Sequence, residues 1–371
     1  MGGFECAAPR QETKKRIDSL AFTRHDELCR EDYKLLKEIG IYTVREGFLW
    51  SHIDKGNGVY DFVRFEKMLA IGKEEGIEQI WDLNHFDYPD HLDPLTDEFV
   101  AQFACYAKKC AELIKKYEHG PIYIVPVNEI SFFAFMAGSI GLWAPYLRSA
   151  GYRFKQQLVK ASIAAMDEIW KVDANIRFIQ VDPLFDRRAK PPGTVVTKAM
   201  EDAFAEIKFQ TFDMLSGRLM PELGGHPKYL DIIGANYYIY NQEWITGDDL
   251  LDASCHEMIP FEDKERVPLK VLLKELYDRY HLPLILTETG CVGSMRVPWW
   301  RCILPEIDDA IASGLPLLGV CAYPIIDRPD WHDLHLTNSG LWDFENGDKK
   351  MKRVPHEETL AIVREYAKRR R

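Results

Sequence analysis

The sequence has no apolar run of 18 residues, which is about the length that a membrane-spanning helix needs. It has no Gly/Ser-rich or Pro-rich linker, and its eight cysteines form no C-x-x-C pair. The first residues lack the charged and long apolar regions of a secretory signal. We therefore expect a cytoplasmic protein with reduced thiols and no membrane association.

The sequence also has fewer basic residues than acidic residues. Lys and Arg number 47 and Asp and Glu number 58, which gives a net charge of −11. A general nucleic-acid binder needs a basic surface, so we expect no nucleic-acid partner. The hydrophobic share of 46% is that of a folded globule, and the composition leaves a homo-oligomer open.

What the sequence does contain is a repeated alternation of short apolar runs and longer helical patterns. The runs are apolar at consecutive positions, which is typical of parallel strands buried on both faces. The expected strands cover residues 3–5, 42–44, 79–81, 122–125, 178–181, 232–235, 284–286 and 317–320, and the expected helices cover 26–39, 62–75, 97–117, 154–172, 199–216, 269–280, 299–313 and 356–368.

Eight strand–helix units predict an α/β fold with a single domain, a (β/α)8 TIM barrel spanning residues 1–371. A doubly wound open sheet is the alternative. However, no G-x-G-x-x-G motif follows the first expected strand, and the sequence has no Walker A motif. In a TIM barrel the catalytic groups lie at the carboxyl ends of the strands, so the residues just past each apolar run are the candidates.

Two carboxylates stand at such positions. Glu129 follows the fourth expected strand and Glu288 follows the seventh, so they would face each other across the barrel mouth. Two opposed carboxylates suit glycoside hydrolysis, in which a protonated one donates to the leaving oxygen and an ionised one attacks the anomeric carbon. A separation of about 5–5.5 Å implies retention and about 6.5–9.5 Å implies inversion. The alternative is that each Glu is a solvated residue at a strand end.

The motifs around these residues resemble those of glycoside hydrolase family 1, the β-glucosidase-like family of the retaining barrel clan, in a shortened and divergent form. Asn128-Glu129 matches the acid/base motif of the family, and Thr287-Glu288 matches its nucleophile motif. The resemblance implies that Glu129 is the general acid/base and that Glu288 is the nucleophile.

The resemblance also implies supporting residues. Arg45 matches the arginine that hydrogen-bonds the nucleophile, and Tyr237, in the strand-six motif, would orient the same carboxylate. The implied sugar-binding residues are His85, Asn128, Tyr323, Asp330 and Trp331. We expect no cofactor and no metal, because the segment 332–335 lacks the one-turn spacing of a zinc helix.

The chain departs from the family pattern at three places. Tyr323 stands where the family has tryptophan, and Asp330 stands where it has glutamate. Either Glu5 or Gln11 would replace the glutamine that the family carries after strand one. The serine/lysine phosphate grip of the phospho-sugar enzymes is missing, and we expect a cis bond between Tyr323 and Pro324.

The sequence therefore predicts an exo-acting retaining β-glycosidase that binds a carbohydrate substrate. One alternative is a transglycosylase that uses the same two glutamates and excludes water. Another is a catalytically silent sugar-binding barrel. The identity of the sugar, its linkage and the aglycone are left open.

Overall fold

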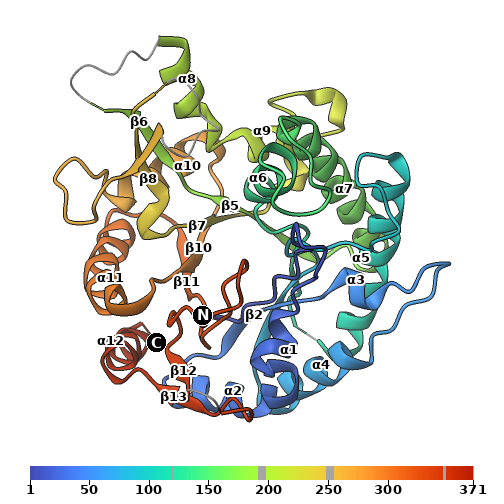
Figure 1. Ribbon diagram of the computed structural model, residues 1–371, viewed down its shortest axis with the longest axis horizontal. Helices are drawn as coiled ribbons and strands as arrows, with labels where there is room; N and C mark the ends of the chain where they lie inside the picture. Colours follow the sequence, from blue (N-terminus) through green and yellow to red (C-terminus); the bar gives the residue numbers. More distant parts are fainter. Residues whose placement is uncertain (119, 191–197, 248–254, 346–347, 371) are drawn as a thin grey trace.

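The computed structural model describes residues 1–118, 120–190, 198–247, 255–345 and 348–370. Eight parallel strands close into a barrel in the order β1-β11-β10-β7-β5-β4-β3-β2, with helices around it (Figure 1). These strands are β1 (Gly2–Gly3), β2 (Thr43–Gly47), β3 (Glu78–Asp82), β4 (Tyr123–Val125), β5 (Arg177–Pro183), β7 (Ile232–Asn236), β10 (Leu284–Thr289) and β11 (Leu317–Ala322). The predicted TIM barrel is confirmed.

The outer helices begin and end within a few residues of their predicted bounds, with one exception. They are α2 (His25–Glu38), α4 (Val63–Glu75), α5 (Asp97–Tyr117), α7 (Gly151–Val172), α8 (Lys198–Ile207), α9 (Gln210–Ser216), α10 (Leu269–Tyr280), α11 (Arg296–Ala312) and α12 (Glu357–Arg369). The predicted helix 199–216 is two helices, α8 and α9. At the break, Lys208 pairs with Glu275 and the Phe209 ring packs on Tyr280. Both contacts are with α10, and the helical periodicity of the sequence does not reveal them.

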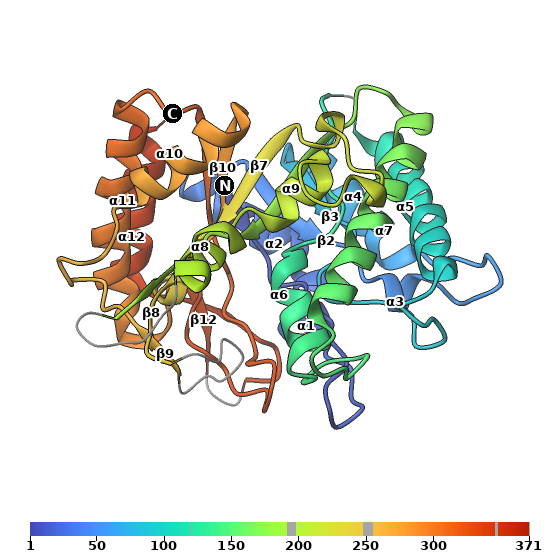
Figure 2. The same ribbon diagram turned by 90° about the horizontal axis from the view of Figure 1, so that it is seen from above.

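Short elements that the apolar pattern did not predict extend the loops. They are α1 (Ser19–Thr23), α3 (Trp50–Ile53), α6 (Ile130–Ala134), a π-helical segment (Phe135–Ser139), 3-10 turns (Pro221–Leu223, Pro227–Tyr229, Ile239–Asn241 and Gly293–Met295), a three-stranded sheet of β6 (Asp186–Ala189), β8 (Gln242–Ile245) and β9 (His256–Met258), and a hairpin of β12 (Trp342–Phe344) and β13 (Arg353–Pro355). Figure 2 shows α1, α6, β8, β9 and β12 together on one side of the barrel. The turns at Pro221–Leu223 and Pro227–Tyr229 lead from α9 into the amino end of β7, whereas the other segments follow carboxyl ends of barrel strands and build the rim around the mouth.

The barrel interior is packed rather than open. Its buried cluster consists of β-branched side chains from five strands, namely Ile80, Val125, Ile179, Val181, Ile232 and Ile285. Such residues fill the inside of TIM barrels in layers. A larger apolar core lies between the strands and the surrounding helices. The packed interior leaves the carboxyl ends of the strands as the place for a site.

The closure of the barrel depends on two glycines. Strand β1 pairs with β11 at Gly2 and with β2 at Gly2 and Gly3. A Cβ atom on Gly3 would lie 2.2 Å from Cδ2 of Tyr323. Glycine is thus required here by close packing, and this contact joins the barrel seam to a residue at the strand ends.

The other structural expectations concern thiols and membranes. All eight cysteines carry free thiols. Within the described ranges, every helix is too short or too polar to cross a bilayer.

Candidate active site

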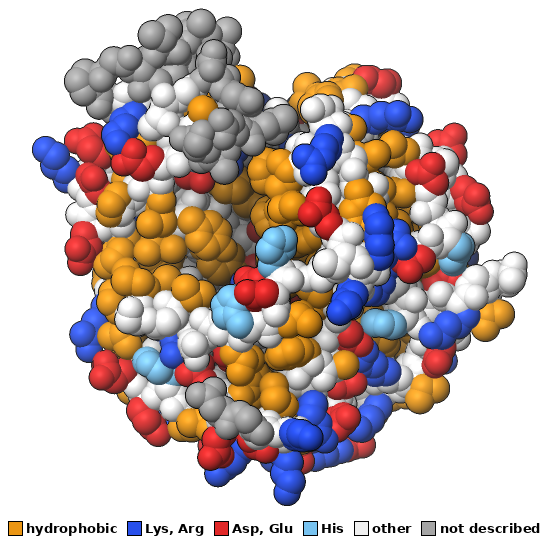
Figure 3. All heavy atoms as spheres, in the orientation of Figure 1, with side chains coloured by type: hydrophobic (Ala, Val, Ile, Leu, Met, Phe, Trp, Pro, Cys, Tyr) orange, Lys and Arg blue, Asp and Glu red, His pale blue; other side chains and the backbone are white. Residues whose placement is uncertain are grey.

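A cavity of about 690 Å³ opens at the carboxyl ends of the strands. Its walls include Glu129, Glu288, His85, Tyr238 and Tyr323, which come from five different strand ends. Figure 3 shows hydrophobic side chains gathered around the middle of this view of the molecule. A cavity of this size suits a small ligand, and its polar groups converge at the base.

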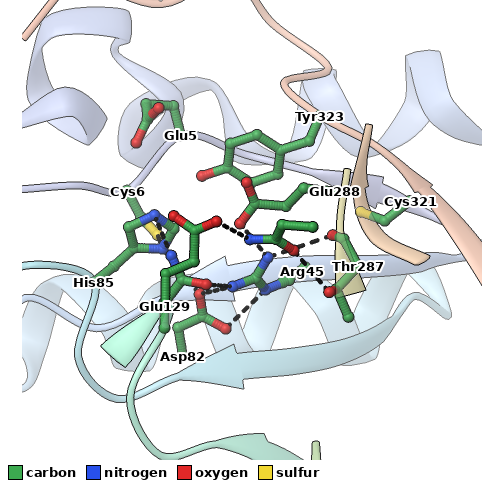
Figure 4. A network of polar contacts seen from close by, with 12 residues as sticks. Glu5, Cys6, Arg45, Asp82, His85, Glu129, Thr287, Glu288, Cys321 and Tyr323 are labelled. Carbon is green, nitrogen blue, oxygen red and sulfur yellow. Dashed lines mark hydrogen bonds and ion pairs between the residues drawn. The ribbon is translucent and has the colours of Figure 1, made fainter. Parts of the chain in front are cut away.

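Glu288 is held by two hydrogen bonds. Arg45 donates from a guanidinium nitrogen to Oε1 at 2.5 Å, and the Tyr238 hydroxyl donates to Oε2 at 2.6 Å. Arg45 is itself fully buried and donates twice to Asp82, at 2.9 and 2.7 Å. Figure 4 shows Arg45 lying between Asp82 and Glu288. Each oxygen of Glu288 therefore has a fixed direction, as an attacking carboxylate requires.

The predicted role of Tyr237 is wrong in the structure. Its hydroxyl accepts hydrogen bonds from Gln242 at 2.7 Å and from Arg266 at 3.1 Å, away from Glu288. Tyr238 makes the predicted contact instead. Both residues follow the end of β7, where successive side chains of an extended chain point to opposite faces. An error of one position thus exchanges the two tyrosines.

Glu129 occupies a different environment. Its backbone is left-handed, with φ of 43°, in a region that non-glycine residues rarely adopt. Asn236 donates to its Oε1 at 2.9 Å, and Thr287 in turn donates to Asn236 at 2.7 Å. Burial and the nearby charge of Glu288 raise the pKa of Glu129 well above its ordinary value. The carboxyl group is therefore suited to carry a proton at neutral pH.

Asn236 is a positioning residue that the sequence did not reveal. It stands in a motif at the end of β7, but only the fold brings it to Glu129 from two strand–helix units away. Asn236 bonds Oε1 of Glu129 and not Oε2. Figure 4 shows the side chains of Glu129 and Glu288 converging on the same space.

His85 lies in the cavity wall and Asn128 lies behind it. The His85 ring contacts Asp82 through Nδ1 at 2.9 Å, and Asn128 donates to Nε2 at 3.0 Å. The Asn128 oxygen accepts from Arg45 at 2.6 Å. Asn128 is fully buried behind the cavity wall, so in this structure it does not make the predicted contact with a sugar hydroxyl. Its amide instead links the histidine to the arginine.

The segment after β11, the eighth strand of the barrel, differs from expectation at one position. Tyr323 and Trp331 line the cavity, and the bond between Tyr323 and Pro324 is cis as predicted. Asp330 does not line it, because one of its oxygens accepts the backbone N–H of His332 at 2.7 Å. A short carboxylate readily caps its own turn in this way. Arg328 takes a place in the wall, with its guanidinium carbon 4.5 Å from the Trp331 ring centroid.

Glu5 and Gln11, the two candidates after β1, lie in different places in the structure. Gln11 donates to the backbone oxygen of His332 at 3.0 Å and so holds the loop after β11. Glu5 lines the cavity. Its Oε1 accepts from the Ala7 N–H at 2.8 Å, whereas its Oε2 is buried without a hydrogen-bond partner. Arg328 lies 3.5 Å from this oxygen, so Glu5 and Arg328 form a charged pair in the wall.

Among the residues that the structure describes, two groups of side chains have the composition of metal ligands. Cys6, Asp82 and His85 place their ligand atoms within 4.8 Å of one another, but Asp82 already accepts two hydrogen bonds from Arg45. The second group, Asp330 with Asp333 and His335, lies in the loop past strand eight. It is largely exposed and is not part of the cavity wall.

Comparison with known proteins places this site in context. No family model matches the chain. Human cytosolic β-glucosidase is 24% identical over 92% of this chain and 86% of its own length. The chain is a divergent relative of the β-glucosidases. The 6-phospho-β-glucosidase AscB of Escherichia coli is 22% identical over 80% of this chain and 74% of its own.

A solved structure agrees in fold. The family 1 β-glucosidase from Thermotoga maritima, in complex with isofagomine lactam, superposes with a TM-score of 0.73. The match covers 93% of this chain and 87% of that chain at 16% identity. The relatives named above are glycoside hydrolases, and the β-glucosidase-like chain shares the fold of the Thermotoga maritima enzyme.

Proposed function

We propose that the protein is an exo-acting retaining β-glycosidase that hydrolyses O-glycosidic bonds by double displacement. The observation that carries this proposal is the pairing of Glu129 and Glu288 in one cavity with opposite surroundings. Glu288 lies against the Arg45 guanidinium, whereas burial raises the pKa of Glu129. Two carboxyl groups in such contrasted environments divide naturally into a nucleophile and an acid.

The reaction follows from this division of roles. Glu288 attacks the anomeric carbon while Glu129 gives its proton to the departing oxygen, and a covalent glycosyl-enzyme forms. Glu129, now a carboxylate, takes a proton from water, whose oxygen displaces Glu288 from the sugar. After this step Glu129 is protonated again and Glu288 is again a free carboxylate, so the enzyme is regenerated with water as the only other reactant. No cofactor takes part in these steps.

Supporting groups have separate tasks in this scheme. Arg45 and Tyr238 hold both oxygens of the nucleophile. Asn236 orients Glu129. The remaining wall residues His85, Tyr323, Trp331, Glu5 and Arg328 offer an aromatic surface and hydrogen-bonding groups for one sugar ring.

Substitution of the two glutamates tests the assignment. We expect Glu288→Ala and Glu129→Ala each to lower kcat on a 4-nitrophenyl β-glycoside by about 100-fold or more, because each removes a reacting group. The matched control is Glu222→Ala, an exposed carboxylate outside the cavity, which should keep full activity. Undiminished turnover in either cavity variant would refute the assignment.

The same enzyme can be tested for its acceptor. Product analysis with and without an added sugar separates hydrolysis from transfer to that sugar. Mass spectrometry after incubation with a fluorinated glycoside should show one glycosyl adduct on Glu288, whereas a silent sugar-binding barrel would show none. We further propose one catalytic domain over residues 1–371, acting in the cytoplasm, as the name of its human relative states for that protein.

A further inference from the structure

A buried lysine in the cavity wall has no use in the mechanism above. Lys155 lies on α7, is only 6% exposed and lines the cavity. Its ammonium donates to the side-chain oxygen of Gln210 at 2.9 Å. Among the residues that the structure describes, no carboxylate lies within ion-pair distance of this ammonium. A buried charge is normally paired, because leaving it unpaired costs free energy.

A second cation lies in the same wall. Arg187 lines the cavity from β6 and donates through Nε to Glu243 at 2.8 Å. Burial lowers the pKa of Lys155, and the positive charge of Arg187 lowers it further. Asp182 opposes this effect, but one of its oxygens already accepts the Ser131 N–H at 2.9 Å. Glu243 therefore balances Arg187, and Lys155 remains without a close counter-charge.

The position of these cations assigns them to the leaving-group side. Helix α6 begins directly after Glu129, and Phe132 and Phe135 from this stretch line the cavity. Glu129 delivers its proton to the leaving oxygen, so the wall that continues from it faces the aglycone. Helix α7, which carries Lys155, packs against α6.

The wall around the cations is aromatic. Besides the two phenylalanines after Glu129, it contains Tyr152 and Phe185, and the Arg187 guanidinium lies 4.4 Å from the centroid of the Phe185 ring. Such surroundings hold a flat apolar group and strengthen the attraction between opposite charges.

We propose that Lys155 and Arg187 bind an anionic group, a carboxylate or a phosphate, on an aromatic or other apolar aglycone. This inference rests on the proposed glycosidase function and names the substrate class of the same site. The anion supplies the counter-charge that Lys155 lacks, and the aromatic wall holds the remainder of the aglycone.

Three aryl β-glycosides with the same sugar test the proposal: a neutral one, one with a ring carboxylate and one with a ring phosphate. We expect the wild type to have a higher kcat/KM for at least one anionic substrate than for the neutral one. Lys155→Met should lower the anionic kcat/KM by about 10–100-fold, the size of a lost charged hydrogen bond. It should change the neutral kcat/KM less than threefold.

Controls separate a specific effect from a structural one. Lys171→Met, at an exposed lysine on the same helix, should leave all three values unchanged. Lys155→Arg should restore part of the anionic preference, and thermal unfolding checks that each variant is folded. An equal loss on neutral and anionic substrates, or no anionic preference in the wild type, would overturn the proposal. Failure of the wild type on every glycoside would instead refute the glycosidase function.

Discussion

Arg45 shows how a single buried cation organises the proposed catalytic residues. It is 1% exposed, and its donors reach Asp82, Glu288 and Asn128. The acidic neighbours offset the cost of burying the guanidinium, and its planar fork fixes their geometry. His85 joins the same network through Asp82. One residue on β2 therefore ties Glu288, the proposed nucleophile on β10, to the cavity-lining histidine after β3.

The protonation of Glu129 predicts the pH dependence of activity. Its pKa is raised by burial and by Glu288, which favours the acid form. We expect kcat/KM for a phenyl β-glycoside to fall as alkaline pH removes this proton. A dinitrophenyl glycoside, whose leaving group needs no protonation, should lack this alkaline decline. The measurement is a pair of pH–rate profiles, and identical alkaline limbs for both substrates would contradict the assigned role of Glu129.

At the scale of elements, His25 joins α2 to β2. Its ring nitrogens contact Asp32 at 2.8 Å and Glu46 at 2.9 Å, and the ring stacks on Phe4 at 3.7 Å. Burial lowers the pKa of His25, but Glu46 and Asp32 outweigh burial and raise it to about 9. The charged imidazole thus fastens a helix to the barrel wall.

This ion cluster predicts a pH-dependent stability. Because the folded pKa exceeds the unfolded value of about 6.5, His25 stabilises the fold fully below pH 6.5 and loses this contribution as pH rises through 9. We expect a fall of about 3 kcal/mol in its contribution to the free energy of unfolding, measured by urea denaturation at several pH values. His25→Gln should be less stable and should lack most of this decline. A variant that keeps the same slope would show that other groups cause it.

At the scale of the whole molecule, the barrel seam and the cavity depend on the same glycine. Gly3 pairs β1 with β2, and its Cα lies against the Tyr323 ring, which lines the cavity. We expect Gly3→Ala to lower the free energy of unfolding by about 1–3 kcal/mol through overpacking, and to lower activity by displacing Tyr323. Denaturation and kcat/KM measure the two effects.

Gly120 provides the control for this prediction. A Cβ atom there would meet nothing within 4 Å, and Gly120 is exposed. Gly120→Ala should leave both stability and activity close to those of the wild type. A Gly3 variant as stable and active as this control would show that the seam tolerates a side chain.

The alternation of apolar runs and helical patterns was sufficient to predict the barrel, because strand and helix preferences are largely local. The strand ends also identified Glu129 and Glu288, since a charged residue just past a buried run has few places to lie except a cavity. The split of 199–216 into α8 and α9 escaped prediction because contacts with α10 decide it.

Which side chains finally face the cavity was decided by tertiary structure alone. Tyr238 rather than Tyr237 reaches Glu288, and Arg328 rather than Asp330 enters the wall. Lys155 joins them from near the start of a helical pattern that carries no local signal of a site. The chemistry of a strand end can be read from neighbouring residues. The direction of a side chain in a loop, or its burial beneath another loop, depends on contacts with other elements, such as the contact of Tyr238 with Glu288 on β10 and that of Lys155 with Gln210 on α9.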